Sequence, residues 1–215
     1  MGDAFTSVTC GFRGAATHFL HPTPRGGPVE RNRRGPVMLT PTGLRVFCRG
    51  KPDWGVGHLL SDDGGAKVTV FFLSGGKRTL DTTIAELDLV TGTAALDPIL
   101  DLAGQVNWQH AHHNLYVVEL RPTIFEKERR FFEANPHWLP EKPCVYVGMT
   151  GLTPDERFQK HLRGEKDAWF VQKYGQRLLP DLYRHFNPMP YDLAHVMEPE
   201  LARRLREQGY GVWQN

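Results

Sequence analysis

The sequence predicts two folded parts, a small all-β barrel followed by an α/β domain. Two observations predict this order. Short β-rich runs separated by turn residues fill positions 43–90, and segments of strand and helix character mix from position 114 onward. The chain has 215 residues, of which 40% are hydrophobic, and is therefore long enough for two compact domains with packed cores.

Composition sets limits on location and partners. The net charge of +2 neither predicts nor excludes a polyanionic partner. Apolar runs are too short for a membrane helix, and the first residues do not have the pattern of a secretory signal. Cys10, Cys48 and Cys144 are far apart and odd in number, which favours a reducing compartment over a disulfide scaffold. We expect a cytoplasmic protein with no membrane partner.

The first half divides into an arm and a barrel. Residues 1–37 are rich in Gly, Pro and Arg without periodicity, which predicts a disordered arm. Residues 38–92 form the predicted barrel, because Gly- and Asp-rich breaks with hairpin chemistry separate its four or five strands. The clearest strand runs are 44–48, 54–60, 66–73 and 77–80.

The barrel segment resembles a known class of binding module. Trp54-Gly55-Val56-Gly57, Val68-Thr69-Val70-Phe71-Phe72 and Gly75-Gly76-Lys77 are similar to segments of the SH3-like, Tudor-like barrels attached to bacterial DNA-repair and transcription proteins. This resemblance implies a module that binds a protein or a nucleic acid and has no catalytic activity.

Residues 93–112 are predicted to form a linker with one short helix over 94–103. Leu96, Ile99, Leu100 and Ala103 would share one face of that helix. The linker ends in His110, His112 and His113, and a zinc enzyme centred on these three histidines is one alternative function. No carboxylate or cysteine stands nearby at ligand spacing, which argues against it.

The second half contains two strands, each with a tyrosine, followed by a well-marked helix. The strands are 114–120, with Tyr116, and 143–150, with Tyr146; an extra helix is predicted between them at 124–132. Thr153-Pro154-Asp155-Glu156 has the pattern of a capping box with proline at the first helical position. Starting the helix there puts Arg157 and His161 on one face and assigns Phe158 and Leu162 to the buried face.

A C-terminal amphipathic helix is predicted from about Tyr191 to Glu207, before a final strand at 210–215. Its apolar stripe is Leu193, Met197, Leu201 and Leu205. Glu198 lies at the border of this stripe, where a carboxylate needs a metal ion or an arginine as partner. Pro199 disfavours helical geometry at Glu198, so Glu200 is a rival for the same role.

This ordered set resembles the GIY-YIG nuclease superfamily over residues 113–215. Asn114-Leu115-Tyr116 stands at the first motif, Tyr146-Val147-Gly148 at the second, and Arg157 and His161 on the following helix. Glu198 and Asn215 match the late glutamate and the terminal asparagine. The chain departs from the family in having Asn114 in place of glycine, an insertion between the tyrosines, and Pro199. The resemblance implies an α+β fold in which a small antiparallel sheet is flanked by helices.

The resemblance also implies roles for these residues. Tyr116 would be the base, with a phenol pKa lowered by a neighbouring cation, and Tyr146 would orient the water. Arg157 would bind the scissile phosphate, and His161 would contact the phosphate or relay the proton. Glu198 would hold Mg²⁺ or Mn²⁺. Gly148 and Asn215 would support this site.

The expected function is therefore a metal-dependent endonuclease acting on DNA or RNA, with DNA favoured and the barrel as its recruitment module. The alternative is a catalytically inactive adaptor that keeps the nuclease fold and binds nucleic acid or protein. A basic stretch after the catalytic helix could follow a nucleic-acid backbone, although a solvated surface explains it equally well. Its basic residues are Lys160, Arg163, Lys166 and Lys173.

Overall fold

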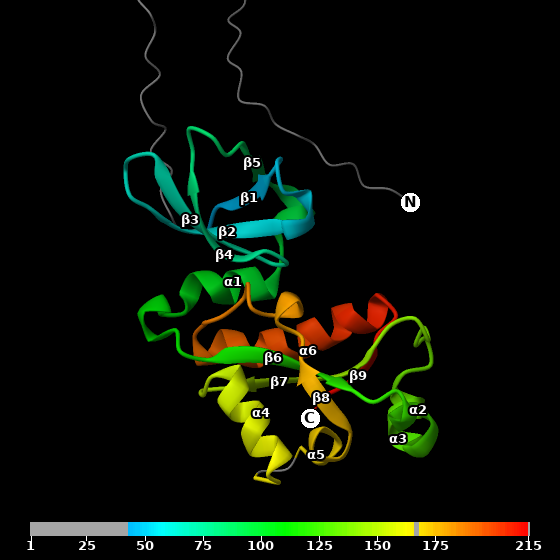
Figure 1. Ribbon diagram of the computed structural model, residues 1–215. Coiled ribbons are helices and arrows are strands. Elements are labelled where there is room, and N and C mark those ends of the chain that lie inside the picture. The colour runs from blue at the N-terminus through cyan, green and yellow to red at the C-terminus, as the bar shows by residue number, and fades with distance from the viewer. Residues whose placement is uncertain (1–42, 166–167, 215) are drawn as a thin grey trace, which may run out of the picture.

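The computed structural model describes residues 43–165 and 168–214. The predicted arm, Lys166 and Asn215 lie outside these ranges. The described residues form an α+β structure with two sheets, one built from the first half of the chain and one from the second (Figure 1).

The first sheet has five strands in the order β4-β3-β2-β1-β5, and all neighbours are antiparallel. The predicted strands are confirmed, and β5 is the fifth. The inward-facing residues of β3, Val68, Val70 and Phe72, pack with Val46 and Leu59 in a small core. Within the described residues β4 and β5 are not paired with each other, so the sheet is not closed by hydrogen bonds. The strands are β1 (Arg45–Cys48), β2 (Val56–Asp62), β3 (Lys67–Phe72), β4 (Gly76–Asp81) and β5 (Leu87–Val90).

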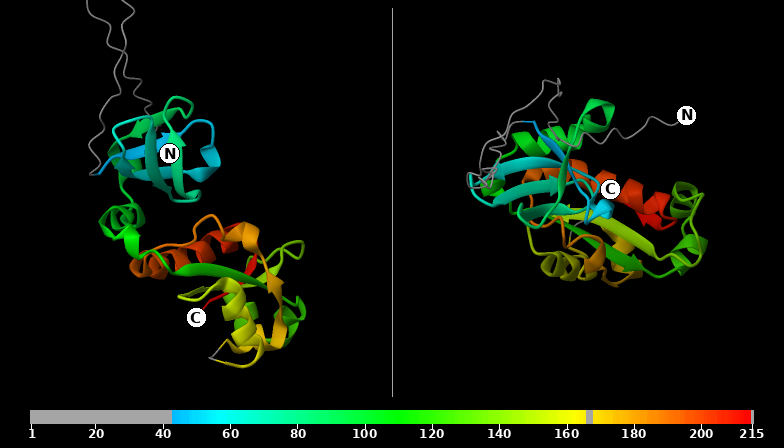
Figure 2. Two further views of the ribbon diagram at one scale, coloured as in Figure 1. Left: turned by 60° about the vertical axis from the view of Figure 1, so that its left-hand side comes forward. Right: turned by 90° about the horizontal axis from the view of Figure 1, so that it is seen from above.

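The linker helix α1 (Pro98–Gln105) lies between the two sheets (Figures 1 and 2). Asp97 caps it by accepting hydrogen bonds from the backbone N–H groups of Ile99 and Leu100. The helix therefore begins four residues later than predicted. Leu100 and Ala103 are fully buried as expected, whereas Leu96 precedes the helix and is 77% exposed, so its assignment to the buried face is wrong.

The second sheet has the strand order β8-β6-β7-β9. β6 pairs antiparallel with β7 and β8, but β9 runs parallel to β7, so the prediction of an antiparallel sheet is wrong at this edge. Figure 1 shows α6 on one face of the sheet and α4 and α5 on the other. The strands are β6 (Asn114–Leu120), β7 (Cys144–Thr150), β8 (Gly175–Leu178) and β9 (Gly211–Trp213).

The helices of the second half largely follow the sequence signals. The capping box forms: the Thr153 side chain accepts from the Glu156 N–H, and the Glu156 carboxylate accepts from the Thr153 N–H. The predicted insertion helix is divided in two at Glu128, and the C-terminal helix runs unbroken through Pro199. Among the described helices, none combines the length and apolar character needed to cross a lipid bilayer. The helices are α2 (Thr123–Lys127), α3 (Arg129–Ala134), α4 (Pro154–Leu162), α5 (Trp169–Tyr174) and α6 (Tyr191–Glu207).

Direct contacts join the five-stranded sheet to the second half. Phe71 points away from its own sheet's core and is fully buried, 5.5 Å from the Trp108 ring. Arg204 of α6 donates hydrogen bonds at 2.7 Å to the Leu73 carbonyl and the Ser74 hydroxyl. Gly76 has a φ of 70°, and a Cβ there would lie 2.0 Å from the His185 carbonyl oxygen. Only glycine fits this turn, for both conformation and space.

A polar cluster lies between β1, β2 and α1. Arg45 is only 5% exposed, and its guanidinium donates to the Ala95 carbonyl, to the Asp101 carboxylate and to Nδ1 of His58. The pKa of His58 is held below its usual value by burial and, to a smaller extent, by the Arg45 charge, while Asp101 opposes the shift. A neutral His58 ring is the form that can accept from Arg45.

The packing of α1 against His58 predicts an unusual effect at Gly104. A Cβ at this position would lie 2.3 Å from His58 Cε1 and Nε2. In an open helix, replacing Gly with Ala stabilises by up to about 1 kcal/mol. Here we expect Gly104→Ala to destabilise by about 1–3 kcal/mol through overpacking, measured by urea unfolding. In a His58→Ala background the same change should be neutral or stabilising; a gain in stability in both backgrounds would contradict the packing.

The buried His58 also predicts a pH dependence of stability. Because its pKa is lower in the folded protein, the unfolded chain takes up the proton first as pH falls below about 6.5. The free energy of unfolding should therefore fall from pH 7 to pH 5. His58→Gln keeps an acceptor for Arg45 but does not titrate, so this variant should lose less stability over the same interval. Equal slopes for the two proteins would show that His58 contributes nothing.

Candidate active site

The pairing of β6 with β7 brings the two tyrosines together. Tyr116 is opposite Gly148 and Val118 is opposite Tyr146, so both rings emerge on the same face of the sheet. The ring centroids are 6.0 Å apart and the rings are stacked at 28°. A Cβ at Gly148 would lie 2.5 Å from the Tyr116 hydroxyl and 2.9 Å from Tyr146 Cε1. The absence of a side chain at Gly148 therefore makes the space that the two rings occupy.

Helix α4 adds Arg157 and His161 to the tyrosines. His161 is 2% exposed, and its Nε2 is 2.8 Å from the Tyr116 hydroxyl. Its ring centroid lies 5.8 Å from that of Tyr116 and 6.0 Å from that of Tyr146. The burial of this face of α4 differs in part from the prediction: Phe158 is buried, but Leu162 is 40% exposed and His161 takes the buried place.

The Arg157 side chain has one unsatisfied donor. Its guanidinium hydrogen-bonds Tyr116, yet its Nε is buried and has no hydrogen-bond partner among the described residues. Leaving a buried charged donor without an acceptor is costly. An anion beside Arg157 would satisfy it, and a guanidinium binds phosphate oxygens through paired N–H groups.

Helix α6 contributes Glu198. This carboxylate is half-buried, and burial raises its pKa above the usual value, while His195 and the Met149 backbone N–H oppose the shift. Its negative charge in turn raises the pKa values of Tyr116 and Tyr146. The charge of Glu198 therefore reaches both tyrosines, although its helix α6 lies on the opposite face of the sheet from α4.

The two candidate glutamates of α6 have different surroundings. Glu200 forms ion pairs with Arg203 at 2.7 Å and Arg204 at 2.6 Å, which lower its pKa. No ion pair within the described residues involves Glu198. Glu200 is therefore occupied by two arginines, whereas Glu198 is not engaged in an ion pair in the part of the chain that the structure describes.

The pKa values of the tyrosines differ from the sequence-based expectation. Burial raises the pKa of Tyr116 above its usual value and outweighs the hydrogen bonds with Arg157 and Tyr146, which lower it. Burial also raises the pKa of Tyr146 strongly. The neighbouring Arg157 does lower the Tyr116 pKa as predicted, but burial outweighs it, so the predicted net lowering is wrong and both phenols are protonated at neutral pH.

The predicted basic stretch is partly neutralised by its neighbours. Arg163 pairs with Glu165 at 2.8 Å and Lys173 with Glu128 at 2.9 Å. Lys160 lies close enough to Glu156 and Glu165 to lower their pKa values. These residues therefore offer less free positive charge than their number suggests.

The histidines of the linker do not form a metal centre. His112 Nδ1 lies 2.8 Å from the His110 carbonyl oxygen, and the His112 and His113 rings are 4.3 Å apart. Across the ranges 43–165 and 168–214, no group of three or more His, Cys, Asp or Glu side chains is placed to hold a metal ion. The zinc alternative has no support in this geometry.

Sequence reasoning missed His195, whose charge acts on Glu198. Its spacing of three residues from Glu198 on one helix was the available signal. The Tyr191 and His195 rings are stacked with centroids 6.0 Å apart, and Tyr191 also meets His113 at 5.0 Å. The imidazoles of the linker thus lie beside the helix that carries the candidate carboxylate.

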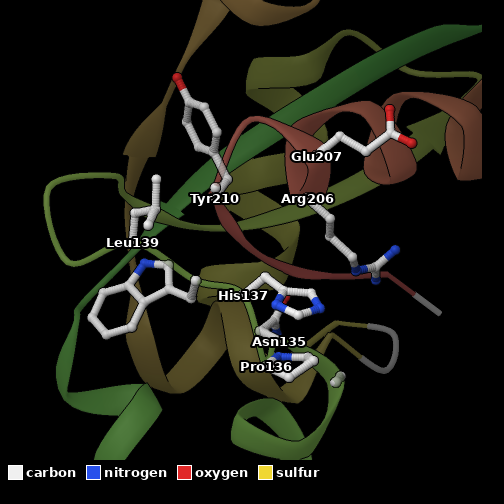
Figure 3. A pocket seen from close by; sticks show the side chains of 10 residues that line it. Asn135, Pro136, His137, Leu139, Arg206, Glu207 and Tyr210 are labelled. Carbon is white, nitrogen blue, oxygen red and sulfur yellow. The ribbon is translucent and has the colours of Figure 1, made fainter.

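At least three cavities occur among the described residues of the second half. One, of about 340 Å³, lies between the loop after α3 and the end of α6. Figure 3 shows His137, Leu139, Arg206, Glu207 and Tyr210 among its lining residues, and none of the five site residues lines it. Another, of about 660 Å³, has Tyr146 in its wall, and Tyr146 is the one residue of the five that lines it. The third, of about 470 Å³, is lined by residues of α2 and α3.

Comparison with known proteins adds one match. Residues 40–90 match the family described as "Protein of unknown function (DUF3553)". This range covers the five-stranded sheet and carries no stated activity. No curated protein and no solved structure matched the chain.

The close contact at Gly148 gives a stability test of the site. Gly148→Ala places a methyl group against both tyrosines, so we expect a loss of about 1–3 kcal/mol in the free energy of unfolding. Gly151→Ala is the matched control, because its Cβ would lie no closer than 3.4 Å to His113 Nε2. Thermal unfolding of both variants measures the difference. Equal melting temperatures would contradict the packing of the two rings over Gly148.

Proposed function

We propose that this chain is a metal-dependent nuclease of the GIY-YIG type that hydrolyses phosphodiester bonds in nucleic acid, with DNA as the favoured substrate. The observation that carries the proposal is that Tyr146, Arg157, His161 and Glu198 all act on Tyr116, while the buried Nε of Arg157 lacks a hydrogen-bond partner among the described residues. A phosphate group in this space supplies the missing acceptor.

Glu198 suits a hard divalent cation. A half-buried carboxylate free of ion pairs within the described residues needs a positive partner, and Mg²⁺ is often bound by one or two carboxylates while keeping several waters. Mn²⁺ has similar oxygen preferences. The bound ion would supply positive charge to the phosphoryl oxygens as negative charge develops there.

The raised pKa of Tyr116 makes a free tyrosinate an unsuitable base at neutral pH, so we assign the proton transfer to Tyr116 and His161 together. With His161 protonated on Nδ1, its Nε2 accepts the phenol proton while the phenol oxygen takes a proton from water. The water oxygen forms the new bond to phosphorus and the bond to the leaving oxygen breaks. The leaving oxygen then takes a proton from solvent.

Arg157 and Tyr146 position the reacting groups. The Arg157 guanidinium binds the scissile phosphate and offsets charge in the transition state. The Tyr146 hydroxyl, protonated at neutral pH, donates a hydrogen bond that orients the water. The segment 38–92 is then the binding module that recruits residues 113–215 to a nucleic acid or a protein partner, in the cytoplasm.

A cleavage assay tests this function with a matched pair of glutamates. Wild-type protein with Mg²⁺ should cut at least one of four substrates, single- and double-stranded DNA and RNA, and EDTA should stop the reaction. Arg157→Ala should lower kcat on the order of 10²–10³-fold, the scale for a lost donor to a transition state. Glu198→Gln should remove the metal dependence together with the activity.

Glu200→Gln is the control, because Glu200 pairs with Arg203 and Arg204 outside the site. This variant should keep wild-type cleavage once folding is confirmed by circular dichroism. If wild-type protein binds nucleic acid but cuts none of the four substrates with Mg²⁺ or Mn²⁺, the chain is the catalytically inactive adaptor instead.

A further inference from the structure

The insertion between the two tyrosines forms part of a second cavity beside the site. Helices α2 and α3 contribute Lys127, Arg129 and Arg130 to its wall, and α5 and β9 contribute Trp169 and Trp213. Its volume of about 660 Å³ falls in the range of roughly 300–1,000 Å³ that is usual for pockets taking small organic groups. Tyr146 lies in the wall of this cavity and also in the candidate active site.

We propose that this cavity binds an unpaired nucleotide next to the scissile phosphate, with its base against Trp169 and its phosphate against the insertion's cations. The inference rests on the proposed function and deepens it: the substrate class becomes nucleic acid with unpaired nucleotides at the cut. The shared chemistry, a flat aromatic base joined to a phosphate, is the same in DNA and RNA.

The aromatic wall offers a half-exposed ring on a fixed support, and Lys173 Nζ lies over this ring, 4.4 Å from its centroid. Trp169 is 51% exposed although it is large and apolar. Its neighbour Phe170 is buried, meets it at a centroid distance of 5.2 Å, and packs edge-on against Trp213 at 4.6 Å. Every base has a π-face, so an accessible indole held in this way can stack on any base.

The part of the wall that comes from α2 and α3 carries positive charge. Among the described residues no side-chain hydrogen bond or ion pair involves Lys127 or Arg130, and the Arg129 side chain pairs with the exposed Glu133. The single acid of this wall, Glu128, is already bonded to Lys173 and to the Tyr174 hydroxyl. The cavity therefore combines an aromatic surface with a positive rim, which is the combination that binds single-stranded nucleic acid.

The geometry selects unpaired over paired nucleotides. A base inside a duplex would have to leave its stack and its partner to enter a cavity, which costs free energy. In an overhang, flap or loop the base is already unpaired, so it can enter the cavity without this cost of unpairing. Because Tyr146 lines the cavity and is also a residue of the candidate site, the proposal puts the nucleotide next to the phosphate at Arg157.

The test compares full-length wild type with Trp169→Ala, Trp169→Phe and Phe132→Ala. Phe132 is the matched control, because it is 54% exposed and comes from the insertion but does not line this cavity. The probes are fluorescein-labelled DNA, one a duplex with a single-stranded flap and one fully paired, together with their RNA equivalents. Binding is measured by anisotropy in EDTA, so that it does not depend on cleavage.

We expect Trp169→Ala to bind the flap probe about tenfold more weakly, the scale of one lost base–aromatic stack. Its affinity for the fully paired probe should be unchanged. Trp169→Phe should recover most of the flap affinity, and Phe132→Ala should match wild type. The flap probe should also quench tryptophan emission in wild type and quench it less in Trp169→Phe.

The inference is overturned if Trp169→Ala binds both probes like wild type, or if it loses affinity for both equally. It is also overturned if wild type does not prefer the flap. Failure of the proposed function looks different. In that case wild type with Mg²⁺ cuts neither probe, while the preference for the flap and its dependence on Trp169 persist.

Discussion

The buried hydrogen bond between Tyr116 and His161 is the interaction on which the candidate site depends. It joins strand β6 to helix α4, and both of its side chains are almost fully buried. The bond holds two buried polar atoms 2.8 Å apart, so it fixes the height of α4 over the sheet. That height carries Arg157 to the Tyr116 hydroxyl, and Gly148 leaves the room below it. This bond depends on the register of β6 and β7, on the residue at which α4 begins, and on the polar groups of Tyr116 and His161.

Local signals predicted most of the elements. The capping box at Thr153 and Glu156 set the start of α4, and the apolar stripe set the bounds of α6. The failures come from partners distant in sequence. The insertion is divided at Glu128, a residue that bonds to Lys173 and Tyr174 of α5. Strand β9 pairs in parallel with β7 because of where the chain runs after the end of α6. Hydrophobic periodicity does not predict this path.

Order and spacing named four side chains that act on Tyr116 in the fold, Tyr146, Arg157, His161 and Glu198, but not the burial or charge effects around them. Hydrophobicity assigned Leu162 to the buried face of α4, whereas His161 is buried there and Leu162 is exposed. A polar side chain such as His161 can be buried when it has a buried hydrogen-bond partner, here the Tyr116 hydroxyl. The choice between Glu198 and Glu200 needed the positions of Arg203 and Arg204. The direction of the tyrosine pKa shifts needed the extent of burial, which exceeds the effect of the neighbouring guanidinium.

Helix α6 is unbroken and carries functionally distinct side chains at two points along its length. The charge of Glu198 raises the pKa values of the two tyrosines. Six residues further on, Arg204 donates hydrogen bonds to the turn between β3 and β4. Arg204 also donates a hydrogen bond to the Glu200 carboxylate of the same helix, which holds its side chain in place. One helix therefore both carries the Glu198 carboxylate and anchors the turn of the five-stranded sheet, so the position of that sheet and the position of the carboxylate share a single support.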